Sequence, residues 1–379
     1  MPADQAARWA EAVGAVGDWD AVVERAAFHG LVPLLARHVE TVPSRAVPGR
    51  VVARLGVDAR RITRRNVALT AELLALLRQL DARGVRAIPY KGPVLAASMY
   101  DHVGLRDFSD LDLLVRRDDV PAAKAVLLRR GYRPQYDLPA AQEAAFIQTR
   151  YEHPFERPDD GIIVEVQWAF VPRYFALHLD YERLWARTEE VAIGGRTVRG
   201  LSPEDLLLAL VVHGGKHLWR RLGWVCDVAE LIRSRPGLDW DTVRADAERL
   251  GVRRLLDLGL RLARDVLDAR LPAHVTTRVD EDAVVGTLSA RTQAGWRARP
   301  ETWPGTWESI RFHLRARERW RDRLRYCVGV ATTTTPGDWT SVVLPSGLFP
   351  LYYPLRAVRL AAKYGGIAGR RLVSGRGPA

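Results

Sequence analysis

The chain has 379 residues and a formal net charge of +12, and 47% of its residues are hydrophobic. This length allows two or three domains with large cores. The two cysteines provide neither a disulfide framework nor a zinc-binding spacing. No apolar run approaches the ~20 residues that span a bilayer, and the N-terminus lacks the basic and apolar segments of a signal peptide. We therefore expect a soluble, cytoplasmic protein.

The basic charge has two explanations. It suits anionic partners such as nucleotides, nucleic acid or a membrane surface. Arg also far outnumbers Lys, and Ala, Val, Leu and Gly are abundant, which is typical of a GC-rich genome whatever the ligand. No stretch interleaves basic and aromatic residues in the way that a base-stacking surface does, so nucleic acid is not favoured as a partner, although an RNA acceptor stays open.

The first part of the chain, residues 1–80, is expected to be a helical lead-in. Apolar residues recur there at steps of three and four, and Gly84 suits the end of the last helix. The following part, residues 81–200, changes to a mixed pattern. The elements expected in it are a strand at 85–90, a turn at Lys91-Gly92-Pro93, a helix, a strand at 110–115, a second helix, and a hairpin with its turn at Pro158–Gly161.

A helical domain is expected at residues 201–330. Ser202 is a good N-cap for a long helix over 202–234, with Pro203 at its first position. Further helices are predicted at 239–250, 250–270, 275–293 and 306–328. The remainder, 331–379, is expected to end in a basic amphipathic helix. This tail either packs on the body with a basic outer face, as we prefer, or touches a membrane or an acidic partner.

Three carboxylates stand out in the mixed region. Asp110 and Asp112 are one residue apart on a strand, so they share a face, and Glu165 lies in a second apolar strand. If the two strands are neighbours, all three acids converge. Such a cluster repels itself unless it holds a cation, and we expect two Mg²⁺ (or Mn²⁺) ions bound for in-line transfer of a nucleotidyl group. A solvated Asp pair at a strand end is the simpler alternative.

Basic residues near these acids are candidates for binding phosphate. Gly92 begins a helix, where backbone N–H groups can face an anion, and Lys91 adds a positive charge. Arg106 either reaches phosphate or pairs with Asp107 or Asp110.

A second constellation lies on the helix expected at 202–234. His213, Lys216, His217, Arg220 and Asp227 fall within about a third of its circumference. The adjacent Gly214-Gly215 suggests close approach of an anionic group, and we prefer Lys216 and His217 as triphosphate ligands. Zinc binding by the two histidines is disfavoured because the glutamate of a metalloprotease helix is missing. A solvated polar face is the remaining reading.

Together, the Lys-Gly turn, the SDLDLLV strand and the later strand acid resemble the DNA polymerase β-like nucleotidyltransferase superfamily. They look most like a bacterial family of uncharacterised nucleotidyltransferases that has a Lys-Gly turn, and the resemblance covers about residues 30–270. The matching positions are Gly92, Asp110, Asp112 and Glu165. In place of the common Gly-Gly or Gly-Ser turn, this chain has Lys-Gly-Pro.

The resemblance implies an α+β fold with a polymerase β-like mixed sheet flanked by helical N-terminal and C-terminal regions. It also implies transfer of a nucleoside monophosphate from a nucleoside triphosphate (NTP) to a hydroxyl or phosphate acceptor, here a small molecule or a peptide natural product. Two rivals stay open: a non-catalytic nucleotide-binding module, and an interaction protein of the toxin–antitoxin kind that uses the basic tail. The base preference and the oligomeric state do not follow from the sequence.

Overall fold

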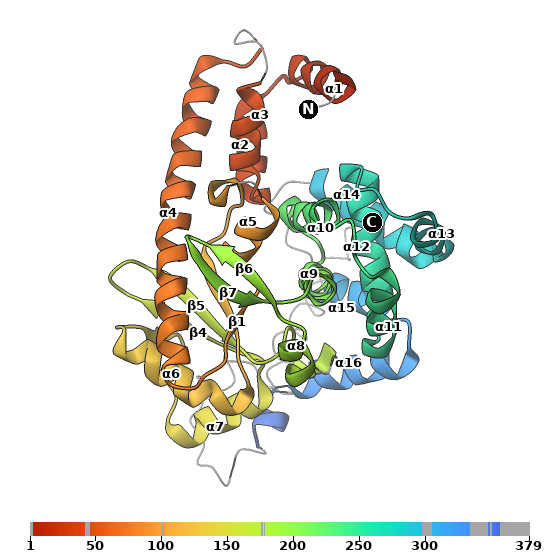
Figure 1. Ribbon diagram of the computed structural model, residues 1–379. Coiled ribbons are helices and arrows are strands. Elements are labelled where there is room, and N and C mark those ends of the chain that lie inside the picture. The colour runs from red at the N-terminus through yellow and green to blue at the C-terminus, as the bar shows by residue number, and fades with distance from the viewer. Residues whose placement is uncertain are drawn as a thin grey trace, which may run out of the picture.

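The computed structural model describes residues 3–41, 46–100, 102–175, 177, 179–297, 305–333, 348 and 351–356. A mixed sheet lies at its centre, with the N-terminal helices along one side and the C-terminal helices along the other (Figure 1). The α+β class with a mixed sheet between helical regions is therefore confirmed. None of the described helices combines the length and the apolar character that crossing a bilayer requires.

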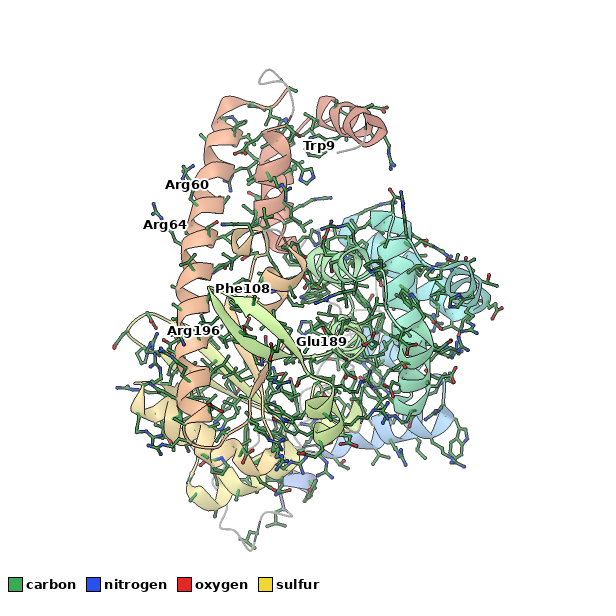
Figure 2. All side chains as sticks on the ribbon, viewed as in Figure 1. Trp9, Arg60, Arg64, Phe108, Glu189 and Arg196 are labelled. Atoms are coloured by element: carbon green, nitrogen blue, oxygen red, sulfur yellow. The ribbon has the colours of Figure 1, made fainter. Side chains whose placement is uncertain are left out.

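The N-terminal helices are α1 (Ala3–Gly14), α2 (Trp19–His29), α3 (Val32–Val39) and α4 (Gly49–Asp81). Because α4 has 33 residues, it is about 50 Å long. Its first half packs on α2 and α3, whereas Leu73 and Leu76 of its second half belong to the core behind the sheet. Arg60 and Arg64 project from its outer side, which places part of the basic charge on this helix (Figure 2).

Five strands form the sheet, in the order β1-β2-β5-β4-β3. The strands are β1 (Ile88–Pro89), β2 (Asp110–Leu114), β3 (Arg133–Pro134), β4 (Glu152–Arg157) and β5 (Ile162–Gln167). Strands β2 and β5 are parallel neighbours, and the other pairs are antiparallel. The structure thus confirms the adjacency of the two acid-bearing strands on which the sequence argument depended.

The two faces of the sheet differ sharply. Leu111, Leu113, Val164 and Val166 point into a core that is closed by α4 and by α6 (Val120–Arg129). This burial follows from the strict alternation of side chains along a strand. The acids of β2 and β5 occupy the opposite face. The short elements around the sheet are α5 (Pro93–Met99), η1 (Val103–Leu105), η2 (Arg117–Asp119), α7 (Ala140–Thr149), η3 (Arg173–Phe175), α8 (Tyr181–Ala186), β6 (Glu189–Ile193) and β7 (Arg196–Gly200).

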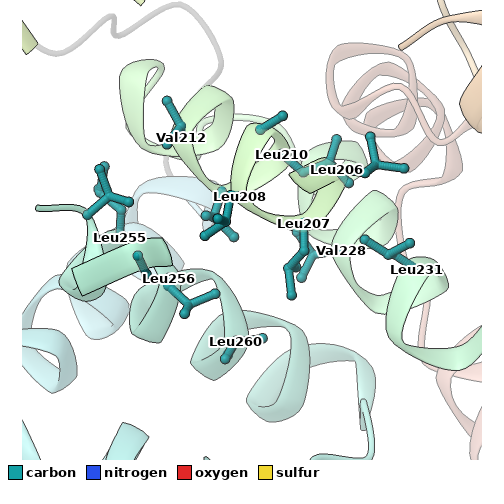
Figure 3. Packing of buried hydrophobic residues seen from close by; sticks show 14 of the residues in the cluster. Leu206, Leu207, Leu208, Leu210, Val212, Val228, Leu231, Leu255, Leu256 and Leu260 are labelled. Carbon is teal, nitrogen blue, oxygen red and sulfur yellow. The ribbon is translucent and has the colours of Figure 1, made fainter. Parts of the chain in front are cut away.

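The C-terminal helices surround a second, leucine-rich core. They are α9 (Pro203–Lys216), α10 (Leu222–Ser234), α11 (Trp240–Leu250), α12 (Arg253–Leu267), α13 (Ala273–Glu281), α14 (Ala283–Arg297), α15 (Thr306–Arg315) and α16 (Trp320–Thr332). Figure 3 shows Leu207 of α9, Val228 of α10 and Leu256 of α12 meeting between their helices. Ser202 caps α9 as expected, since its side chain accepts a hydrogen bond from the N–H of Asp205.

The single helix expected over 202–234 is wrong, because it is broken between α9 and α10. Leu218 and Trp219 have φ angles of 57° and 52°, which a helix cannot accommodate. Fully buried Trp219 folds back on α9, and a Cβ on Gly214 would lie 2.5 Å from its ring. Gly215 faces Leu255 in the same way. The two glycines therefore make room for core side chains and not, as expected, for an anion.

Two further expected helices are each divided in two. The stretch 275–293 divides at Asp282, which leaves the helical conformation and whose carboxylate accepts a hydrogen bond from the N–H of Val284. The stretch 306–328 divides at residues 316–319, where Arg317 turns inward. Most of the tail at 331–379 lies outside the described residues. Within it, Tyr352 is buried in the core behind the sheet, and its hydroxyl accepts a 3.4 Å hydrogen bond from Gln142 of α7.

Candidate active site

The three predicted acids share the open face of the sheet. Asp112 of β2 lies directly opposite Glu165 of β5 in the parallel register, and Asp110 lies two residues earlier on the same face. Asp112 is almost completely buried. Alternation along each strand fixes this convergence, since the same residues that present the acids send leucine and valine into the core behind them.

Gln167 connects two of the acids, and sequence reasoning missed it. Its Nε2 donates 2.8 Å hydrogen bonds to Oδ1 of Asp112 and to Oε2 of Glu165. The Tyr90 hydroxyl in turn donates to Oε1 of Gln167, which fixes the orientation of the amide. The signal was present, because Gln167 is two residues after Glu165 and must share its face.

Lys91 lies among the carboxylates. Its Nζ is 2.6 Å from Oδ1 of Asp112, and its side chain is 10% exposed. Burial alone would lower the pKa of Lys91, but the negative charges of Asp112, Asp110 and Glu165 outweigh burial and raise it. The ammonium group therefore neutralises part of the acid cluster, at the position where we expected a metal ion.

The buried acid cluster holds its protons more tightly than isolated carboxyl groups do. Burial raises the pKa of Asp110, and the charge of Asp112 adds to the rise. Burial also raises the pKa of Glu165 to about 8, helped by Asp112 and by Glu152 of β4. Clustered carboxylate oxygens suit a hard divalent cation. In the part of the chain that the structure describes, however, no three His, Cys, Asp or Glu side chains are already arranged as a metal-binding group.

Gly92 closes the turn between β1 and α5 at a position where only glycine fits. Its φ of +53° is unfavourable for other residues. A Cβ there would lie 3.2 Å from the backbone oxygen of Asp110. The glycine thus brings the Lys91 turn against the acid-bearing strand, whatever the turn binds.

Arg106 forms a buried ion pair with Asp227 of α10. Its Nε and Nη2 donate to the two carboxylate oxygens at 2.8 Å each, and the Tyr100 hydroxyl donates to Oδ1 at 2.9 Å. The alternative of pairing with Asp107 or Asp110 is therefore wrong; Arg65 pairs with Asp107. The Nη1 of Arg106 is buried without a hydrogen-bond partner among the described residues. Its predicted phosphate contact stays a prediction.

The α9 constellation is brought only partly to the acids. Lys216 Nζ donates a 2.9 Å hydrogen bond to the Tyr151 hydroxyl. Burial lowers the pKa of Lys216, although the charge of Glu152 opposes this. Asp227 instead pairs with Arg106, and the Arg220 guanidinium lies 5.5 Å from the centre of the Phe28 ring.

His213 of α9 and His217, directly after its end, are sequence neighbours of this lysine, and their rings lie 4.8 Å apart between centres and are tilted by 59°. Burial, with the charge of Lys91, holds the pKa of His213 well below its ordinary value. Burial, with the charge of Lys216, lowers the pKa of His217 to about 3. Both rings are therefore neutral at pH 7, so His217 could contact a phosphate as a hydrogen-bond donor but not as a cation.

Comparison with known protein families identifies the chain. Residues 16–268, well over half of its length, match the family described as uncharacterised nucleotidyltransferase. The chain belongs to this family. It is a nucleotidyltransferase, and the superfamily implied by the Lys-Gly turn and the strand acids is confirmed. No curated protein matches it.

Solved structures show only a distant likeness to this nucleotidyltransferase. The solution structure of the antibiotic-resistance factor ANT(2'')-Ia is 16% identical with a TM-score of 0.30, covering 61% of this chain and 95% of its own. The crystal structure of ANT(2'')-Ia in complex with adenylyl-2''-tobramycin is 17% identical with a TM-score of 0.28, and the match covers 60% of this chain and 98% of that one. An antigenic nucleotidyltransferase-like protein from Paracoccidioides brasiliensis is 16% identical with a TM-score of 0.31, and the match covers 54% of this chain and 94% of that one. At these values we draw nothing about substrate from the likeness.

Proposed function

We propose that this nucleotidyltransferase transfers a nucleoside monophosphate from an NTP to a hydroxyl or phosphate acceptor and releases pyrophosphate. The observation that carries the proposal is the in-register placement of Asp112 and Glu165 on parallel neighbouring strands, with Asp110 on the same face. We also propose that the acceptor is a small molecule or a peptide natural product. Cytoplasmic NTP would supply the donor.

Asp110, Asp112 and Glu165 would hold Mg²⁺ or Mn²⁺. The clustered oxygen donors fit such an ion, although Lys91 and Gln167 now take up Oδ1 of Asp112. A divalent ion supplies stabilisation of the triphosphate charge and a lower pKa for the attacking hydroxyl. The protein's own part is to orient these carboxylates through Gln167 and Tyr90.

Glu165 is suited to accept the acceptor's proton. A general base works best when its pKa lies near the working pH, and burial raises the pKa of Glu165 to about 8. Lys91 would release Asp112 and move its ammonium onto the nucleotide phosphates beside Gly92. Lys216 and the neutral His217 would donate hydrogen bonds to the same anion.

The second candidate is nucleotide binding without chemistry, and the Lys91–Asp112 ion pair is the observation that favours it. A chain that neutralises Asp112 internally needs no metal there. Incubation with each labelled NTP and Mg²⁺ or Mn²⁺ separates the two. We expect pyrophosphate release that is lost when Asp110 and Asp112 are both replaced by Ala. Nucleotide binding with no pyrophosphate release under any condition would support the binding module.

A further inference from the structure

A second buried charge cluster lies beyond the acids and is made of arginines. Arg150 precedes β4, Arg317 lies between α15 and α16, and Arg356 belongs to the last described segment. Burial raises the pKa of Tyr174, and the positive charges of Arg150, Arg356 and Arg317 all oppose that rise. The geometry agrees, because Arg317 lies over the Tyr326 ring, whose centre is 5.8 Å from that of Tyr174. Arg173, next to Tyr174, donates a 3.0 Å hydrogen bond to the backbone oxygen of Gln148, two residues before Arg150.

Arg317 is buried and forms no ion pair with a carboxylate of the described residues, although the charge of Asp322 acts on it. It is 5% exposed, and its Nη1 donates to the backbone oxygen of His313 at 2.7 Å. Its guanidinium carbon lies 4.1 Å from the centre of the Tyr326 ring and 4.8 Å from that of Phe175. Burial lowers the pKa of Arg317 to about 10, so the side chain stays charged at pH 7.

Neither Arg317 nor Arg150 makes an ion pair with any residue that the structure describes. The Nε atoms of both are buried and lack a hydrogen-bond partner there, as does Nδ1 of His313. A buried charge that is left unpaired costs several kcal/mol. A bound anion would offset this cost, and a guanidinium fork matches the oxygens of phosphate or carboxylate.

Lys216 links this cluster to the acids. Its Nζ hydrogen-bonds the Tyr151 hydroxyl at 2.9 Å, and the Arg150 guanidinium carbon lies 5.8 Å from the centre of the same ring. Glu152 is the next residue after Tyr151, and it lies opposite Gln167 in the register of β4 and β5. The arginines are therefore an extension of the site.

The strand order places Arg150 and the Lys91 turn on opposite sides of the acids. In the order β1-β2-β5-β4, the Lys91–Gly92 turn flanks Asp112 on the β1 side, whereas Arg150 lies on the β4 side, past Glu165. In-line transfer puts the leaving pyrophosphate and the attacking oxygen on opposite sides of the transferred phosphorus. With the triphosphate held at the Lys91 turn and reached by Lys216 from α9, the β4 side, where Arg150 lies, is the side left for the acceptor.

We propose that Arg150 and Arg317 bind a phosphate or carboxylate group of the acceptor, which makes the acceptor an anionic molecule. This inference rests on the proposed function, because the position of the acceptor is inferred from the geometry of in-line nucleotidyl transfer. It excludes neutral and purely cationic acceptors as good substrates.

The test is calorimetric titration of the full-length protein with inorganic phosphate, with and without Mn²⁺ and saturating α,β-methylene analogues of the four NTPs. We expect phosphate binding to persist when the analogues are bound. Arg150→Met and Arg317→Met should each weaken phosphate binding about tenfold or more, as loss of a charge-assisted hydrogen bond implies, and should leave analogue binding unchanged. Arg317→Lys should recover part of the loss.

The matched control is Arg321→Met, at an exposed arginine on α16 beside the Trp320 ring, which should bind phosphate as the wild type does. Circular dichroism shows whether each variant is folded. If Arg317→Met does not fold, Arg150→Met still tests the site, because Arg150 is only half-buried. Phosphate that competes with the analogues would overturn the acceptor assignment. Equal loss in Arg321→Met, or no phosphate binding by the wild type, would overturn the site itself. Failure of NTP turnover alone would leave this readout intact and would count against the proposed function.

Discussion

The acid cluster and the arginine cluster are opposite solutions to the same problem of buried charge. The acids of β2 and β5 are partly neutralised from within, by Lys91 and by the hydrogen bonds of Gln167. Arg150 and Arg317 contact aromatic rings, and Arg317 also donates to a backbone carbonyl, but neither forms an ion pair with a described residue, although the charge of Asp322 acts on Arg317. In the acid cluster, the Lys91 ammonium group occupies the place of a bound cation. In the arginine cluster, no described side chain takes the corresponding place of a bound anion. On our proposals, the two clusters would bind ligands of opposite charge.

The largest expected effect is on catalysis at the acid cluster. Asp112→Asn keeps the volume of the side chain and removes its charge. We expect pyrophosphate release to fall about a thousandfold, since a metal-binding and charge-stabilising carboxylate is lost. Exposed Asp118→Asn, six residues along the chain, should change the rate less than twofold. A rate within tenfold of wild type in Asp112→Asn would contradict the role of the acids.

Metal-free stability should depend on pH through Glu165. Its pKa rises from an ordinary 4.5 to about 8 on folding. The folded state therefore holds the proton more tightly, and stability should fall as pH rises through this window, by up to about 1.4 kcal/mol per pH unit. Glu165→Gln should flatten that part of the profile. Urea unfolding in EDTA at intervals from pH 5 to 8 measures it, and parallel profiles for the two proteins would refute the burial argument.

Lys91→Met tests the internal cation. Without the ammonium group, Asp112 loses its cationic competitor for a divalent ion, so Mn²⁺ should bind about tenfold more tightly, or ~1.4 kcal/mol. Electron paramagnetic resonance titration of free Mn²⁺ gives the affinity without any assay of activity. Lys124→Met removes a comparable ion pair, with Glu143 at 2.6 Å, and should not alter Mn²⁺ binding. Weaker Mn²⁺ binding in Lys91→Met would show that the lysine assists the metal.

An effect of similar size, on packing, is expected at the turn that carries Lys216 between the two clusters. Gly214→Ala places a methyl group 2.5 Å from the Trp219 ring and should lower the free energy of unfolding by about 1–2 kcal/mol. Gly237→Ala, where no atom lies within 4 Å of the added carbon, should be nearly neutral. Chemical denaturation of both variants compares them, and an equally stable Gly214→Ala would show that the turn is loosely packed.

The acid face could be predicted from sequence because it depends on local rules. Alternation fixes which side of a strand Asp112 and Glu165 occupy, and one further assumption, that the strands are neighbours, brings them together. Gln167 follows from the same rule and was within reach.

The partners of the basic residues could not be predicted, because each comes from a distant part of the chain. Arg106 meets Asp227 across 121 positions, and Arg317, which we propose to bind the acceptor, lies beyond residue 300. The glycines of α9 were misinterpreted for a related reason. A glycine shows that something approaches closely, but only the fold shows that Trp219 does so.

The most direct test of the account is a crystal structure with Mn²⁺ and a non-hydrolysable NTP analogue. Anomalous scattering locates the metal without reference to activity. We predict a Mn²⁺ peak within coordination distance of both Asp112 and Glu165, about 2.0–2.3 Å, with the Lys91 ammonium moved from Asp112 onto the phosphates and the Arg150–Arg317 cluster clear of the triphosphate. A structure in which Lys91 stays on Asp112 and no metal lies between the acids would contradict it.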